Sequence, residues 1–328
     1  MACSKTLTLN PVSEGDVPLE QAIYSSTHGA IYGVRGGWVH KFNATTGKLI
    51  ASSVFSDDAV GPSSITELSG VIYVCSWWTN KFPEILAFRD NHDLFSIDPT
   101  TLESTNTHIW KTYNSGYDDS KWIFGPFQII SDGTRIWGFA SNSLVFFVVP
   151  SNPTALQLYS GFGGISYGGG PASLDLIWDD VNSVVAMTSQ DGPVVAKYDT
   201  TGQVNDTNNR FTKRVVGLCY CPDTDKYYAV DNTSIVVTLE AADFRAVGAI
   251  GSINTGEALA NPRRIKFNPN TGYLYVPGWA SNSVIVIDPV LETVVEIQTG
   301  FNQPWDVVIA GSKMFAVQNA PIGLREIT

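Results

Sequence analysis

Apolar and polar positions along the chain repeat a short pattern: an apolar stretch, a tight polar turn and a second apolar or aromatic stretch. The turns carry Gly, Asn, Asp and Pro, the residues that β-hairpin turns favour. No segment keeps a 3.6-residue period, so helices are expected to be few. The pattern therefore predicts seven β-hairpins, at residues 23–34, 64–74, 128–139, 176–187, 218–230, 265–276 and 307–317.

A proline precedes six of these hairpins, and two further strand-like stretches follow the hairpins, for example at residues 283–300. Proline fits the entrance of a strand because its missing N–H need not join the ladder. The unit is a four-stranded antiparallel sheet of about 45 residues, the length of a β-propeller blade. The prediction is a single all-β domain over residues 1–328, a seven-bladed β-propeller with blades at 18–61, 62–125, 126–170, 171–215, 216–261, 262–303 and 304–328 plus 1–17.

The two ends of the chain share the last blade in this prediction. The stretch after Pro304 has room for about three strands, and residues 1–17 contain the alternating sequence Thr6-Leu-Thr-Leu-Asn10. Together these two stretches amount to about one repeat. The N-terminal strand is therefore expected to be the outermost strand of the last blade, which leaves no unpaired sheet edge between the termini.

One repeat also carries a family resemblance. Residues 261–300, with IKFNPNTGYLYV followed by NSVIVIDPVLETVVEIQTG, resemble the YVTN family of β-propeller repeats. The likeness lies in the proline before the inner strand, the NPNTG turn, the YV-type second strand and the ID turn before the outer strand. It implies a propeller fold. It does not select a function, because propellers include binding scaffolds, surface-layer proteins and several unrelated enzymes.

Composition narrows the class of partner. The chain has 20 Lys and Arg against 31 Asp and Glu, a net charge of −11 that repels phosphate backbones and disfavours a nucleic-acid partner. No apolar run approaches the roughly 18 residues of a membrane helix, so no membrane insertion is expected. Only 16% of residues are charged, and Ser, Thr, Asn, Gly and Trp are abundant, as in extracellular β-proteins. With no signal peptide visible, we expect an extracellular protein or a component of a virion (phage) surface, within a larger assembly; the cytoplasm is the alternative location.

Two long segments, about 75–93 and 105–125, interrupt the repeat and are rich in aromatic residues. In a propeller they open on one face, together with the loops between second and third strands. They could pack on each other as a local core, or form a recognition patch for a protein or glycan, because Trp, Tyr and Arg are favoured interface anchors. The candidate binding residues are Trp77, Trp78, Phe88, Arg89, His92, Trp110, Tyr113, Tyr117 and Trp122.

A calcium-dependent hydrolase of the lactonase or gluconolactonase type is the alternative function. Asn and Asp residues in the loops of the same face would place oxygen ligands around the channel mouth, as calcium prefers. The ligand pattern of such hydrolases is not found residue by residue, and tight loops favour Asn and Asp in any case. Calcium is therefore only an alternative, and no metal ligand is assigned. The residues concerned are Asn142, Asp191, Asp231, Asn232, Asn282 and Asn319.

Other catalytic patterns are weak. Of the acidic pairs, Asp179-Asp180 falls in a hairpin turn, and Asp118-Asp119 is the pair on the aromatic face that could serve as general acid and base. Cys3, Cys75, Cys219 and Cys221 lack zinc-site spacing and are expected to be structural thiols, buried in the core. No catalytic residue is assigned. The main prediction is a non-enzymatic binding or structural propeller that docks its partner through the aromatic face.

Overall fold

The computed structural model describes residues 19, 21–35, 38–54, 61–77, 94–108, 128–140, 144–149, 152–160, 175–188, 195–200, 204–208, 215–250, 260–319 and 323–328. Throughout these ranges the regular structure consists of β-strands and no helix is present, which confirms the all-β prediction. No helix in these ranges is therefore long and apolar enough to cross a membrane. The described strands form seven antiparallel sheets, which we number in chain order.

The first three sheets come from the N-terminal half of the chain. Each has four strands, and strands that follow one another in sequence pair with each other. The first sheet contains β1 (Gln21–Ser25), β2 (Ala30–Arg35), β3 (Trp38–Asn43) and β4 (Leu49–Val54). The second contains β5 (Gly61–Leu68), β6 (Val71–Trp77), β7 (Leu94–Ile97) and β8 (Ser104–His108). The third contains β9 (Gln128–Ser131), β10 (Ile136–Ala140), β11 (Leu144–Val149) and β12 (Asn152–Ser160).

The remaining sheets repeat this order, except that the seventh has three described strands. The fourth contains β13 (Leu176–Asp179), β14 (Val184–Thr188), β15 (Val195–Tyr198) and β16 (Val204–Asn208). The fifth contains β17 (Val215–Cys221), β18 (Lys226–Asp231), β19 (Val236–Glu240) and β20 (Ala246–Ile250). The sixth contains β21 (Lys266–Asn268), β22 (Tyr273–Gly278), β23 (Ser283–Asp288) and β24 (Thr293–Thr299). The seventh contains β25 (Asp306–Ala310), β26 (Lys313–Val317) and β27 (Leu324–Glu326).

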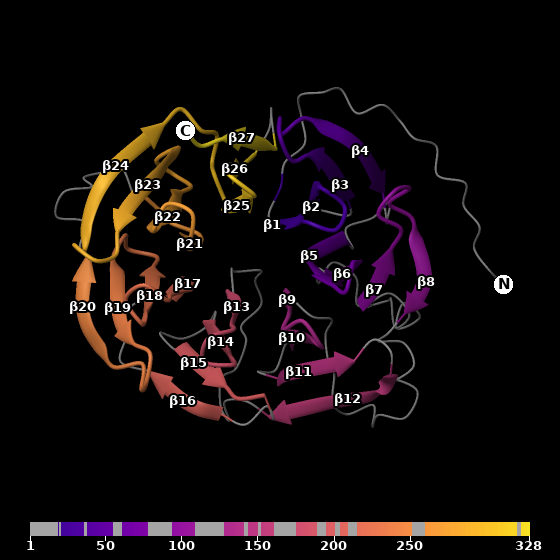
Figure 1. Cartoon of the computed structure of the whole chain (residues 1–328), viewed down its shortest axis with the longest axis horizontal. Helices are drawn as coiled ribbons and strands as arrows, with labels where there is room; N and C mark the ends of the chain where they lie inside the picture. Colours follow the sequence, from indigo (N-terminus) through magenta and orange to yellow (C-terminus); the bar gives the residue numbers. More distant parts are fainter. Residues whose placement is uncertain are drawn as a thin grey trace, which may run out of the picture.

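The seven sheets stand side by side in a ring, with the first strand of each sheet nearest the centre (Figure 1). The first strands contact one another in succession from β1 to β21, and β22 contacts β25 of the seventh sheet. The contact of β25 with β1 brings the last sheet against the first. Each sheet lies within one predicted repeat, except that β5 and β17 each begin one residue earlier than predicted. The predicted N-terminal strand at residues 6–10 lies outside the described residues.

The hydrophobic core is divided into layers between neighbouring sheets. Side chains alternate between the two faces of a strand, and both faces of a sheet meet another sheet, so most inner strands are apolar on both sides. Tyr228, for example, packs with Ile285 between the fifth and sixth sheets, and Tyr227 packs with Ile177 between the fourth and fifth. Cys75, Cys219 and Cys221 are buried, as expected of structural thiols, and Cys3 lies outside the described residues.

Asp and Asn side chains organise the tight turns. In the turn after β13, Asp179 Oδ1 accepts hydrogen bonds from the N–H groups of Val181 (3.1 Å) and Asn182 (3.0 Å). In such Asx turns, the side-chain oxygen accepts backbone N–H groups that have no strand partner within the turn. The Asp179-Asp180 pair therefore belongs to turn chemistry, as expected. Asp118-Asp119 lies outside the described residues.

Candidate functional site

The predicted aromatic residues fall almost entirely outside the described part of the chain. Trp77 is the last residue of β6, where its backbone pairs with Gly61, and nothing is described of its side chain. The aromatic patch therefore stays a prediction. The candidates that lie outside the described residues are Trp78, Phe88, Arg89, His92, Trp110, Tyr113, Tyr117 and Trp122.

The same end of the ring also carries described residues. In a four-stranded antiparallel sheet, the loop between the second and third strands lies at the same end of the sheet as the start of the first strand. These loops and the connections between sheets therefore share one end of the ring, which we call the loop face. The described segments there include residues 231–235, 260–264, 279–282, 302–305 and 318–319.

An arginine lies against two tryptophans on the loop face. The Arg263 guanidinium carbon is 5.3 Å from the ring centroid of Trp279 and 4.4 Å from that of Trp305. Cation–π contacts of this kind hold the planar guanidinium against the aromatic rings. All three side chains are partly exposed, so the cluster contributes apolar ring surface and positive charge to the loop face.

Backbone hydrogen bonds hold these three residues in place. The Arg263 N–H donates to the carbonyl of Pro277 (3.4 Å), and the Trp279 N–H donates to the carbonyl of Asn261 (3.3 Å). The Trp305 N–H donates to the carbonyl of Val317 at 2.6 Å. These hydrogen bonds continue the backbone pairing beyond the strand ends. The sheets therefore fix the backbone from which the three side chains extend.

Amide side chains continue the loop face toward the first sheet. The Gln303 N–H donates to Asn282 Oδ1 (2.8 Å), and Asn319 Nδ2 donates to Gln303 Oε1. Arg35 at the end of β2 donates to Asn319 Oδ1, which links the seventh sheet to the first. The loop face thus presents amide and guanidinium groups beside two tryptophans, the residue types that recognise polar partners with flat apolar surfaces.

A buried ion group lies at the start of the inner strands. Arg264 Nη1 is 3.3 Å from Asp306 Oδ2 and 3.7 Å from Asp175 Oδ1, and all three side chains are at most 7% exposed. Asp175 also accepts hydrogen bonds from the Leu218 N–H (2.9 Å) and from Gln128 Nε2 (3.4 Å). Burial raises the pKa of the Asp306 carboxyl. This group joins the third to seventh sheets around the centre.

Two neighbouring interfaces are held in the same way. Gln21 Oε1 on β1 accepts a hydrogen bond from the Ile65 N–H of the second sheet (3.2 Å). Ser64 Oγ on β5 accepts one from the Ile129 N–H of the third sheet (3.0 Å). One polar side chain near the start of each of these inner strands therefore bonds to the backbone of the next sheet. The chemistry at this level of the ring is intersheet hydrogen bonding.

Three of the candidate oxygen ligands of the calcium alternative, Asp231, Asn282 and Asn319, form hydrogen bonds within the protein. Asp231 accepts hydrogen bonds from the N–H groups of Thr233 (2.7 Å) and Ile235 (3.1 Å) in its own turn, and Asn282 and Asn319 bind neighbouring residues. Within the described ranges no three His, Cys, Asp or Glu side chains form a group suited to a metal ion. Asn142 and Asp191 lie outside those ranges, so the calcium site stays an untested alternative.

Sequence reasoning missed the arginine cluster and the buried ion group, although the sequence contains a signal for both. Arg263 and Trp305 each directly follow a repeat proline, Pro262 and Pro304. The next residue in each repeat, Arg264 or Asp306, belongs to the ion group. Aligning the repeats on their prolines would therefore have placed Arg263 opposite Trp305, and Arg264 opposite Asp306, in neighbouring repeats.

Comparison with models of known protein families and with curated protein sequences finds no match to this chain. The site is therefore interpreted from its own residues.

Proposed function

We propose that this chain is a seven-bladed β-propeller, with YVTN-like repeats, that binds a protein or glycan partner through its loop face without catalysing a reaction. The seven sheets would be the blades, and residues 1–328 a single domain. We further propose an extracellular or virion-surface location, within a larger assembly, because the chain is poor in charge and rich in Trp, Asn, Ser and Gly.

One observation carries the proposal: Arg263 lies against the partly exposed rings of Trp279 and Trp305, on the face where we predict the other aromatic residues to lie. Trp and Arg are the side chains that contribute most to binding at protein interfaces. Flat aromatic rings beside amide groups also match a sugar, whose ring has apolar faces and hydroxyl edges. The proposal therefore extends the predicted aromatic patch across the loop face.

The buried carboxylates support a structural role for the centre of the ring. Asp175 and Asp306 lie against Arg264, and Asp175 accepts a backbone N–H. Carboxylates engaged in this way stabilise the contact between sheets and are not available as a general acid and base. Binding on the loop face is thus the activity that the described groups support best.

The test compares partner binding on an array of glycans and candidate surface proteins, using the labelled full chain. The Trp279→Ala and Trp305→Ala double variant and the Trp77→Ala, Trp78→Ala and Trp122→Ala triple variant should each bind at least tenfold more weakly. Trp178→Ala is the matched control, because Trp178 lies next to the first turn of its sheet, at the opposite end from the loop face. Unchanged binding by folded loop-face variants would refute the proposal.

Calcium provides a separate test. A non-catalytic propeller without a bound ion should keep its melting temperature when calcium is added to the EDTA-treated protein. Tight one-site calcium binding in calorimetry, together with a rise of several degrees in Tm, would favour the hydrolase alternative, because a ligand stabilises the state that binds it. Assays on lactones and esters would then follow.

A further inference from the structure

The fourth strand of each of the first six sheets has one edge without a described strand partner. In five of these sheets the composition of that outer strand limits pairing with another chain. β8 and β16 are mostly polar, β12 contains Pro153 and β20 contains Gly248. β4 has small residues, Ala51–Ser53, at its centre, which offer little apolar surface. Polar, proline and glycine residues weaken a sheet edge as a template for a further strand.

β24, the outer strand of the sixth sheet, has none of these features. It contains the β-branched apolar residues Val294, Val295 and Ile297 and no Gly or Pro. Val295 is 46% exposed and Ile297 is 37% exposed, and Val290 and Leu291 in the preceding turn are exposed as well. These four side chains are half of the large apolar ones that are exposed in the described ranges. Exposed apolar residues gathered on a sheet edge are typical of a surface that binds another chain.

The two faces of β24 differ in their chemistry. Glu296 pairs with Val286, which packs toward the seventh sheet. Ile297 pairs with Ile285, which packs toward the fifth sheet. Directly paired residues share a face of the sheet, so Glu296 faces the seventh sheet and Ile297 faces the fifth. A strand added to β24 would therefore meet an acidic side chain on one face and an apolar side chain on the other.

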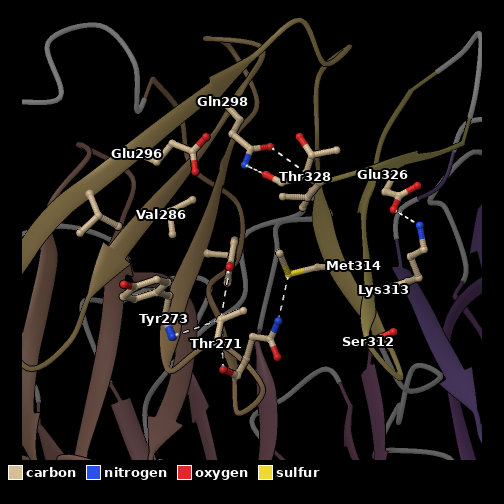
Figure 2. A pocket seen from close by; sticks show the side chains of 14 residues that line it. Thr271, Tyr273, Val286, Glu296, Gln298, Ser312, Lys313, Met314, Glu326 and Thr328 are labelled. Atoms are coloured by element: carbon tan, nitrogen blue, oxygen red, sulfur yellow. Dashed lines mark hydrogen bonds and ion pairs between the residues drawn. The ribbon is translucent and has the colours of Figure 1, made fainter.

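The Glu296 carboxylate lies in a groove of about 560 Å³ between the sixth and seventh sheets (Figure 2). Lys313 also lines this groove, but it forms an ion pair with Glu326 on the seventh sheet. Glu296 is exposed and has no ion-pair partner among the described residues. Its negative charge adds to the net charge of −11 of the chain, and it favours a cationic side chain on a partner.

We propose that β24 binds an extended strand of a partner protein in which basic and apolar side chains alternate. The partner strand would join the sixth sheet as a fifth strand, through backbone hydrogen bonds to the outer edge of β24. A Lys or Arg opposite Glu296 would pair with its carboxylate, and a Val or Ile opposite Ile297 would cover the apolar face. A second copy of this chain fits less well, because each copy has a net charge of −11 and β24 would meet another acidic strand.

This inference goes beyond the proposed function, because it concerns the outer rim of the ring and does not depend on the loop face. The probe is a fluorescent seven-residue peptide in which Lys and Val alternate, and fluorescence anisotropy measures its binding to the full chain. The peptide should bind in a saturable way, and more weakly as salt is added, because ion pairing contributes. A peptide in which Glu and Val alternate should bind at least tenfold more weakly. Equal binding of the two peptides, or no binding of the Lys-Val peptide at about 1 mM, would overturn the proposal.

Two charge variants locate the binding site. Glu296→Lys should weaken binding of the Lys-Val peptide at least tenfold and strengthen binding of the Glu-Val peptide. The matched control is Glu103→Lys, the same charge change at an exposed residue next to β8 of the second sheet. The control should alter binding less than twofold. Equal losses in the two variants would show that only the overall charge matters, and would overturn the assignment to β24.

N-methylated peptides test whether the backbone is paired. Alternate N–H groups of a strand point to the same neighbour, so methylation of all valines or of all lysines removes the donors along one edge. One of these two peptides should bind at least tenfold more weakly than the unmodified Lys-Val peptide. Equal binding of all three peptides would show that side chains alone hold the peptide, and would overturn the addition of a strand.

Light scattering of the protein without peptide tests the other occupant. The chain should be monomeric at micromolar concentration. A dimer that Ile297→Lys dissociates would show that a second copy binds along β24, and would overturn the proposal of a basic partner strand.

Discussion

β17 and β20 are the inner and outer strands of the fifth sheet, and each has a glycine at its third position. β17 is almost wholly buried, whereas Val247 on β20 is 40% exposed. A Cβ added to Gly217 on β17 would lie 2.7 Å from the Arg264 Cα, a backbone atom of the sixth sheet. A Cβ added to Gly248 on β20 would lie 3.2 Å from the Glu292 carboxylate, the end of a flexible side chain.

The difference shows how contact between sheets changes from the centre of the ring outward. Near the centre, the sheets converge until backbone meets backbone, and polar side chains such as Asp175 bond directly to the next sheet. Toward the outside the sheets diverge (Figure 1), and neighbouring sheets meet through side chains that can move. Substitutions should therefore cost most at the centre and least at the rim.

The largest expected effect is at the buried ion group. Asp175→Ala removes a carboxylate from Arg264 and leaves the Leu218 N–H without its acceptor, so the free energy of unfolding should fall by about 3–5 kcal/mol. Urea unfolding measures the change. The control is Asp288→Ala in an outer turn of the sixth sheet, where loss of two exposed backbone hydrogen bonds should cost about 1 kcal/mol. Equal costs would contradict the comparison.

His40 on β3 tests how far burial extends from the centre. Burial lowers the pKa of His40 to about 4, from 6.5, and its Nδ1 lies 2.8 Å from Ser52 Oγ. Between pH 6.5 and 4 the unfolded chain binds a proton that the folded chain does not, so stability falls as the pH falls. The shift corresponds to about 3 kcal/mol over this window.

The measurement is the free energy of unfolding against pH for wild type and His40→Gln. The variant lacks this titration, so its stability should fall less between pH 6.5 and 4. Parallel profiles would show that His40 has the same pKa in the folded and unfolded chains, which would contradict the effect of its burial on β3.

The two glycines provide the most direct comparison. Gly217→Ala should cost about 1–3 kcal/mol, because the backbone of the sixth sheet must shift to admit the methyl group. Gly248→Ala should change stability by less than about 0.5 kcal/mol, because the Glu292 side chain can rotate away. Thermal unfolding of both variants measures the difference. A reversed order would mean that the outer strands pack more tightly than the inner ones.

The smallest effect is expected at the rim. Val290 and Leu291, in the turn between β23 and β24, are each 68% exposed. Replacing either with Lys should change the free energy of unfolding by less than about 0.5 kcal/mol, since little apolar area leaves the interior. Chemical denaturation checks this value. A loss above 1 kcal/mol would indicate that these side chains contact residues outside the described ranges.

Much of the local structure could be predicted from the sequence. The hairpin expected at residues 307–317 is β25 and β26, and the one expected at 265–276 contains β21 and β22. The turns that Asp179 and Asn268 organise were also expected at their positions. These predictions succeed because alternation and turn residues act within a few positions of one another.

The candidate site was much less predictable. Arg263 and Trp305 are separated by 41 intervening residues, and they meet only because consecutive sheets stand side by side. Each residue taken alone has an ordinary interpretation as a loop residue. Only their shared position after a repeat proline connects them, and that relation becomes meaningful once the sheets are known to be neighbours.

The sequence by itself determined that the chain forms repeated antiparallel hairpins, because apolar alternation and turn residues specify strands locally. Only the tertiary structure decided which polar side chains would be buried between sheets. Asp175, Arg264 and Asp306 read as ordinary polar residues at the start of strands, yet they form one buried ion group. The reason is physical: packing of the sheets around a common centre brings residues of different repeats within hydrogen-bonding distance. No local sequence pattern specifies which of these residues meet.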